Sequence, residues 1–127
     1  MNEPAGFMME GDRAVYRPAG IVQFDDVVAW VRAAIALACA KDAEDLLVDT
    51  TALAGFASPD VFQRFLAATE WAEQKVGRLR LAMIAQAEMI DPHKFGVTVA
   101  ANRGLVSNIF TTEAEARAWL DAKRGQP

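Results

Sequence analysis

The sequence predicts a single α/β domain in which a mixed, mostly parallel sheet packs against helices. Helical and strand patterns alternate along most of the chain, and residues 46–48 and 81–85 are uninterrupted apolar runs. Such runs are typical of parallel strands that are covered on both faces. The predicted element order is β-β-α-β-α-β-α-β-α, and the helical crossovers require the strands from the second onward to be largely parallel. With 127 residues and no linker or repeat, residues 1–127 are expected to form one domain.

The first half of the chain is predicted to form a hairpin, a helix and a central strand. Residues 6–10 and 13–17 flank Gly11-Asp12, a pair that suits a tight hairpin turn. A helix should begin near Asp25 or Asp26, because their carboxylates can accept its first free N–H groups. Residues 45–49 then predict the central strand. The core-facing positions of the helix are Val27, Val31, Ile35 and Ala38.

Cap-and-proline patterns predict the next two helices. Ser58-Pro59-Asp60 indicates a helix that Ser58 caps, with Pro59 at its first position and Gly77 at its end. A strand follows over residues 79–85. Asp91-Pro92 repeats the pattern for a helix that stops at Gly104.

The last two elements are a strand and a helix. Residues 105–110 predict the strand, and Thr112 with Glu115 has the spacing of a capping box for the helix. This final helix carries Ala116, Trp119 and Leu120 as its apolar residues.

Trp71 lies in the helix that is predicted after Ser58. On a helical wheel it falls opposite Phe62, between Arg64 and Lys75, so we expect it to face solvent or a partner. An exposed tryptophan is a common interface anchor, and the alternative is a cation–π contact with Arg64 or Lys75 within the monomer. The predicted core face of this helix consists of Phe62, Phe65, Leu66, Thr69, Ala72 and Val76.

Composition and charge narrow the classes of partner. Thirteen Lys and Arg against seventeen Asp and Glu give a net charge of −4, so no broad basic surface is expected for nucleic acid or an anionic membrane. The start of the chain lacks the pattern of a signal peptide, and the longest apolar run, 27–40, is broken by Arg32. The single cysteine, Cys39, fits a reducing compartment. We therefore expect a cytoplasmic protein that enters no membrane and binds no nucleic acid.

Four stretches of the chain resemble a known family in sequence and order. They are residues 46–53, 80–85, 101–110 and 115–120, and together they span roughly residues 12–121. They are similar to the STAS domain, the fold of anti-sigma factor antagonists, and more closely to the SpoIIAA-like proteins. The resemblance implies a non-enzymatic regulatory module that acts through protein contacts.

The resemblance also implies a candidate modification site at Ser58. In STAS antagonists a Ser or Thr just before the second helix is phosphorylated, and Ser58 is the nearest match. A phosphate at a helix N-terminus is favoured by free N–H groups and by the helix dipole. The family's Asp-Ser-Ser-Gly or Asp-Ser-Thr-Gly run is replaced here by residues 55–60, and the alternative is that Ser58 only caps the helix.

No catalytic or metal-binding constellation is apparent in the sequence. The only histidine, His93, follows Asp91-Pro92 and is expected to be a solvated surface residue. Asp49, at the end of the central strand, allows the hypothesis of an enzyme or a phosphoreceiver. A receiver also needs an acidic pair after its first strand and a lysine after its last strand, and the sequence has neither. Asp25 and Asp26 are better explained as helix starters. We expect no metal and no cofactor.

The leading prediction is a STAS-like binding module, with a protein partner or self-association. The first alternative is a domain that binds a small apolar ligand or lipid between sheet and helices, as in Sec14-like relatives, and the second is an enzyme that uses Asp49, Ser58 or His93. Ligands of open α/β sheets gather beyond the carboxyl ends of the strands, here 49–51, 86–88 and 111–112. The candidate binding residues are Asp49, Thr50, Thr51, Ser58 and Trp71.

Overall fold

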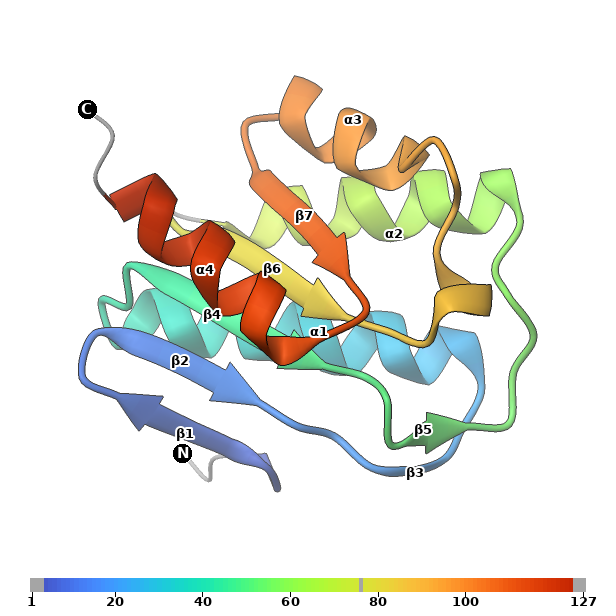
Figure 1. Cartoon of the computed structure of the whole chain (residues 1–127), viewed down its shortest axis with the longest axis horizontal. Helices are drawn as coiled ribbons and strands as arrows, with labels where there is room; N and C mark the ends of the chain where they lie inside the picture. The colour runs from blue at the N-terminus through green and yellow to red at the C-terminus, as the bar shows by residue number, and fades with distance from the viewer. Residues whose placement is uncertain (1–3, 76, 125–127) are drawn as a thin grey trace.

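The sheet has the mixed, mostly parallel form that the sequence predicts. The structure, a computed structural model, describes residues 4–75 and 77–124. Within these residues, five strands form a sheet in the order β1-β2-β4-β6-β7, with β1 antiparallel to β2 and the other neighbours parallel (Figure 1). The strands are β1 (Phe7–Glu10), β2 (Arg13–Tyr16), β4 (Asp45–Asp49), β6 (Arg80–Ile84) and β7 (Val106–Phe110).

Helices cover both faces of this sheet. Four α-helices lie within the described ranges: α1 (Phe24–Ala40), α2 (Val61–Gln74), α3 (Phe95–Asn102) and α4 (Glu113–Arg124). The first three pack on one face, and α4 packs alone on the other (Figure 1). Along β4, Leu46 and Val48 point toward the three helices while Leu47 points toward α4. All three side chains are fully buried, which confirms the prediction of a strand covered on both faces.

The first half of the chain follows the predicted pattern closely. Glu10 pairs with Arg13 at the end of the hairpin, and Gly11 in the turn has a φ of +62°. The predicted core positions of α1, from Val27 to Ala38, are all buried. The helix begins slightly earlier than predicted, because Gln23 is its N-cap and Asp26 closes a capping box with it.

A short second sheet was not predicted. Residues Gly20–Ile21 form β3, which pairs in parallel with β5 (Leu53–Ala54) beyond the carboxyl end of the main sheet. A 3₁₀ turn, Ala87–Met89, follows β6. Segments of two or three residues are too short to show a hydrophobic period, so a pattern argument cannot detect them.

The prediction for the start and end of α2 is wrong. Asp60 is the N-cap: its carboxylate accepts from the backbone N–H of Gln63, and the Gln63 amide oxygen accepts from the N–H of Asp60. This reciprocal pair satisfies two free N–H groups, so Ser58 is not needed as a cap and Pro59 lies before the helix. The helix ends at Gln74, before Gly77.

The next helix also begins later than predicted. The carboxylate of Asp91 accepts a hydrogen bond from the N–H of Phe95, the first residue of α3, at 2.8 Å. Pro92 and His93 therefore form a turn ahead of the helix. No described helix combines the length and the apolar character that a membrane span requires.

The buried face of α2 differs in part from the predicted face: Ala72 is buried and Phe65 packs against the core as predicted, but Phe62 and Leu66 do not. Phe62 and Leu66 are 67% and 45% exposed, while the buried residues of the helix are Ala67, Ala68 and Ala72. The predicted face was centred on the largest apolar residues, and it is therefore rotated about the helix axis from the face that is buried. Val76, which also belonged to the predicted face, lies outside the described residues.

Candidate functional site

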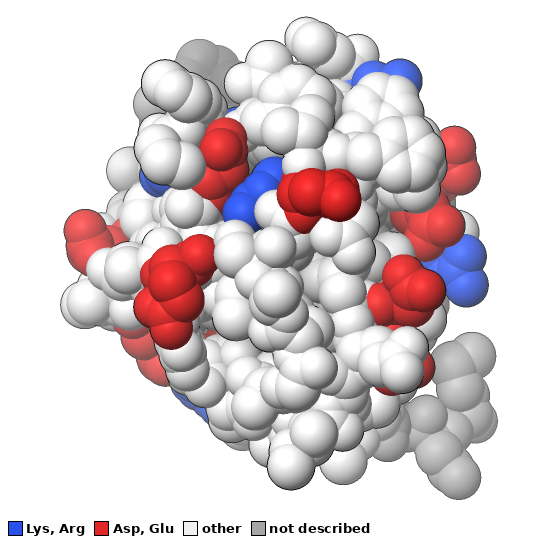
Figure 2. Space-filling model, turned by 90° about the vertical axis from the view of Figure 1, so that its right-hand side faces the viewer, with Lys and Arg blue, Asp and Glu red and all other residues white. Residues whose placement is uncertain are grey.

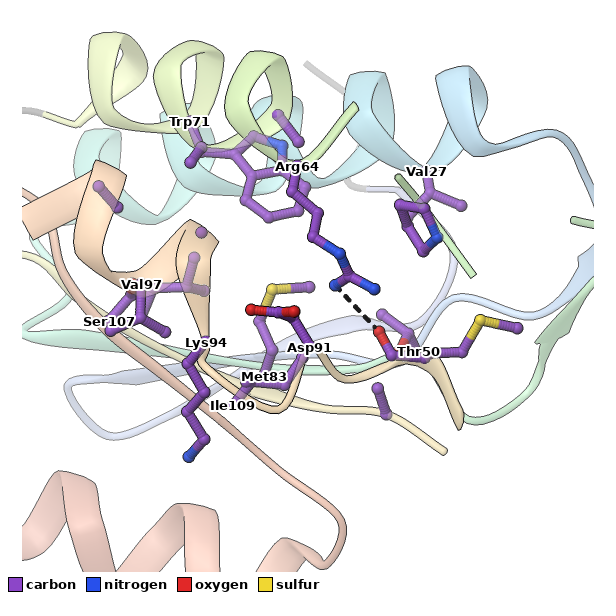
Figure 3. A pocket seen from close by; sticks show the side chains of 18 of the residues that line it. Val27, Thr50, Arg64, Trp71, Met83, Asp91, Lys94, Val97, Ser107 and Ile109 are labelled. Atoms are coloured by element: carbon purple, nitrogen blue, oxygen red, sulfur yellow. Dashed lines mark hydrogen bonds between the residues drawn. The ribbon is translucent and has the colours of Figure 1, made fainter. Parts of the chain in front are cut away.

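A cavity lies between the sheet and the helices on its three-helix face. Its volume is about 140 Å³, and it opens toward the carboxyl ends of β4 and β6. The side chains around it come from α1, α2, α3 and the two strands β6 and β7 (Figure 3). This is the edge at which ligands of open α/β sheets are expected to bind.

The walls of the cavity are mostly apolar. Leu81 and Met83 of β6 and Ile109 of β7 line the sheet side, while α2 contributes Ala67 and Ala68. Val97, Ala100 and Gly96 of α3 line it as well. Small residues on both facing helices leave space that larger side chains would fill, which explains why the cavity forms here.

Trp71 points inward and lines this cavity, so the prediction that it faces solvent or a partner is wrong. Its indole N–H donates to the backbone carbonyl of Val28 on α1, at 3.0 Å. This bond satisfies the polar end of the ring while the rest packs against the core. Among the described residues, the cation–π contacts involve other rings, and Lys75 instead donates to the carbonyl of Gly104.

Arg64 provides the charged group at the mouth of the cavity. One of its N–H groups donates to the carbonyl oxygen of Met89 at 3.2 Å, and another donates to the hydroxyl of Ser58 at 3.0 Å. Figure 3 shows the side chain extending from α2 into the space above the sheet. Arg64 thereby ties the loop before α2 to the 3₁₀ turn after β6.

Two other charged residues line the site but are engaged elsewhere. Asp91 accepts from the N-terminus of α3, as described above. The ammonium group of Lys94 donates to the amide oxygen of Asn108 at 2.8 Å and lies 5.1 Å from the centre of the Phe110 ring. In Figure 3 the Lys94 side chain extends away from Arg64. Arg64 is thus the cation that faces the mouth.

The candidate residues at the end of β4 divide between the two faces of the sheet. Thr50 lines the cavity, and its hydroxyl donates to the carbonyl of Ile84 at 2.8 Å. The carboxylate of Asp49 accepts from the backbone N–H and the hydroxyl of Thr51, at 3.0 and 2.6 Å. Asp49 and Thr51 therefore form a closed turn and do not line the cavity.

The second oxygen of Asp49 faces the α4 side. Arg17 donates to it at 3.3 Å and to Glu113 at 2.6 Å. Glu113 also accepts from Arg117, and these two guanidinium groups lower the pKa of Glu113 from its usual value near 4.5 to about 2. The role that the geometry gives to Asp49 is to hold α4 on the sheet, and its surroundings do not favour a phosphoreceiver.

A second ion-pair cluster holds the other end of α4. Asp45 is fully buried and accepts from Arg13 at 2.8 Å and from Arg124 at 2.9 Å. Arg13, which is 8% exposed, also pairs with Asp121 at 2.6 Å. These contacts satisfy the charges that the amino end of the sheet buries.

The residues considered for catalysis do not converge. The hydrogen bonds of the described residues connect none of Asp49, Ser58 and His93 with another. His93 is exposed, as predicted. Within the described ranges, no group of three His, Cys, Asp or Glu side chains is arranged to hold a metal ion.

Of the five candidate binding residues, Thr50 and Trp71 line the cavity and Ser58 contacts a residue that does. Arg64 was missed because the wheel placed it on the outer face of α2. The available signal was the spacing of Arg64 and Trp71, two turns apart, with the two alanines at 67 and 68 between them.

Figure 2 shows the end of the molecule at which the carboxyl ends of the parallel strands lie. Its surface is largely uncharged, with scattered acidic groups and few basic ones.

No protein-family model matches the chain, and neither curated proteins nor solved structures gave a significant match.

Proposed function

We propose that this chain is a non-enzymatic, STAS-like binding domain that takes a small, largely apolar molecule into the cavity beneath α2 and α3. The observation that carries the proposal is the cavity itself, about 140 Å³ in volume and lined mainly by apolar side chains. A volume of about 150 Å³ accommodates a molecule of the size of benzene. The space therefore suits one ring or a short branched chain better than a long acyl chain.

The surroundings support binding without chemistry. Thr50 and Trp71 line the cavity, and both already donate to backbone carbonyls. Such groups shape and orient a site. Asp91 and Lys94, the lining groups that could carry out general acid–base catalysis, are held by hydrogen bonds to Phe95 and Asn108. The loop from Thr50 to Asp60 forms one side of the mouth, since Thr50, Leu53 and Phe56 line the cavity.

Calorimetric titration with benzyl alcohol, a neutral molecule with one ring, tests the proposal. We expect saturable binding to the native chain and at least a tenfold loss of affinity in the Ala68→Leu variant, whose longer side chain occupies the cavity. Ala33→Leu, on the exposed side of α1, is the matched control and should bind like the native chain. Equal binding by all three proteins, or none by the native chain, would contradict the proposal.

A second candidate function is the protein contact that the STAS resemblance implies. It is favoured by a row of exposed apolar residues on α2: Val61 is 63%, Phe62 67% and Leu66 45% exposed. Exposed apolar rows of this kind mark interaction surfaces. An uncharged apolar row is complementary to the same row on another copy across a two-fold axis, so the occupant that we propose is a second copy of this chain.

Light scattering across a range of concentrations tests self-association. The native chain should show a concentration-dependent rise in mass, and Phe62→Ser should remain monomeric. A native chain that is monomeric throughout would exclude this candidate.

Mass spectrometry of the chain from its native cells would test the separate prediction that Ser58 is phosphorylated.

A further inference from the structure

The proposed cavity ligand acquires a more specific identity from the charge at the mouth of the cavity. We propose that the ligand is a small aromatic or branched aliphatic monocarboxylate whose carboxylate group pairs with Arg64. This inference rests on the proposed binding function and adds the chemical class of the ligand to it.

The hydrogen-bond partners of Arg64 are uncharged. Its guanidinium lies at the edge of an apolar cavity and is half-buried, yet both of its hydrogen-bond partners in the described part of the chain are neutral oxygens, on Met89 and Ser58. Four other arginines that are held in place by hydrogen bonds, at 13, 17, 117 and 124, all have carboxylate partners. A guanidinium in low-dielectric surroundings gains most from an anionic partner.

Within residues 4–75 and 77–124, the hydrogen bonds of Arg64 leave donors for such a partner. A guanidinium carries five N–H donors in a planar fork, and two of them are used by Met89 and Ser58. These two bonds also fix the orientation of the group before a ligand arrives. A planar carboxylate matches the remaining donors better than a neutral amide or hydroxyl does.

The neighbouring charges explain why the ligand should carry one negative charge. Lys94 is committed to Asn108 and the Phe110 ring, so it adds little at the mouth. The carboxylate of Asp91 also lines the cavity, and it is stabilised where it lies by the N–H of Phe95. A second negative charge on the ligand would approach Asp91 without a second free cation to balance it.

A matched panel of ligands separates this inference from the proposed function. Phenylacetate, phenylacetamide and 2-phenylethylamine share one ring and one short arm and differ in the charge of the head group. Their dissociation constants would be measured by calorimetry at neutral pH and constant ionic strength. We expect phenylacetate to bind at least about tenfold more tightly than the amide, because charge-assisted hydrogen bonds are the stronger ones.

Two variants assign the preference to Arg64. In Arg64→Gln the ratio between acid and amide should fall to about one, with the affinity for the amide changed less than threefold. Ser58→Ala removes a neighbour of the guanidinium but no charge, so it should keep the preference for the acid. The comparison on the native chain remains decisive if Arg64→Gln does not fold.

Each outcome has a distinct meaning. Equal binding of acid and amide overturns the inference about the carboxylate and leaves the binding function standing. Tighter binding of the amine also overturns it and assigns the head group to Asp91. Binding of none of the three overturns both the inference and the proposed function.

Discussion

Filling the cavity should stabilise the protein while it removes the site. Ala68→Leu adds three carbon atoms, and about 0.8 kcal/mol for each buried carbon gives roughly 2.4 kcal/mol as the upper limit of the gain. Strain from an imperfect fit costs about 1 kcal/mol or more. We expect a net gain of about 1 kcal/mol in the free energy of unfolding.

Urea unfolding followed by circular dichroism measures this gain as a higher midpoint with an unchanged slope. Ala33→Leu, at an exposed position of α1, makes the same replacement without burial and should change the free energy of unfolding by less than about 0.5 kcal/mol. If Ala68→Leu instead lowers the free energy of unfolding by more than 1 kcal/mol, there is no space next to this residue and the cavity does not extend to it.

Three further predictions concern the ion pairs and the caps. Asp45→Asn leaves the buried Arg13 with one exposed partner and should cost about 3 kcal/mol in urea unfolding, and a cost below 1 kcal/mol would contradict the buried pair. The pKa of Glu113 is about 2 in the folded chain, below its usual 4.5, so its ionised form stabilises the fold. That contribution to stability is complete above about pH 4.5 and is lost as the pH falls toward 2. The thermal unfolding midpoint of Glu113→Gln should therefore depend less on pH over this range than that of the native chain. An equal dependence on pH in both proteins would contradict the stabilising role of ionised Glu113. Asp60→Ala should cost about 1 kcal/mol in chemical unfolding as the loss of an N-cap, and Ser58→Ala less than about 0.5 kcal/mol; the reverse order would restore Ser58 as the cap.

The sheet could be predicted from the sequence because its signals are local and strong. The runs around Leu46 to Val48 and Leu81 to Ala85 are apolar without interruption, and this occurs where a strand is covered on both faces. The turn at Gly11-Asp12 and the capping box of Thr112 and Glu115 are likewise short-range patterns. In each case the residues that carry the signal are the residues that make the contact.

The face of α2 could not be predicted in the same way. A hydrophobic wheel weights Phe62 and Leu66 heavily and the alanines lightly, yet the alanines at 67, 68 and 72 are the residues that face the core. This rotation also hid Arg64 and the inward position of Trp71, which depend on neighbours in α1 and in the 3₁₀ turn. Thr50 was found because the carboxyl edge of the sheet follows from strand order alone.

Methyl chemical shifts in a benzyl alcohol titration show whether the cavity beneath α2 accepts an apolar molecule. We expect saturable shifts at Ala68, Met83 and Ala100, which line the cavity, and none at Ala116, a residue of α4 that is buried against the opposite face of the sheet. Unchanged cavity methyl shifts up to the solubility limit, or equal shifts on both faces of the sheet, would rule out binding in this cavity.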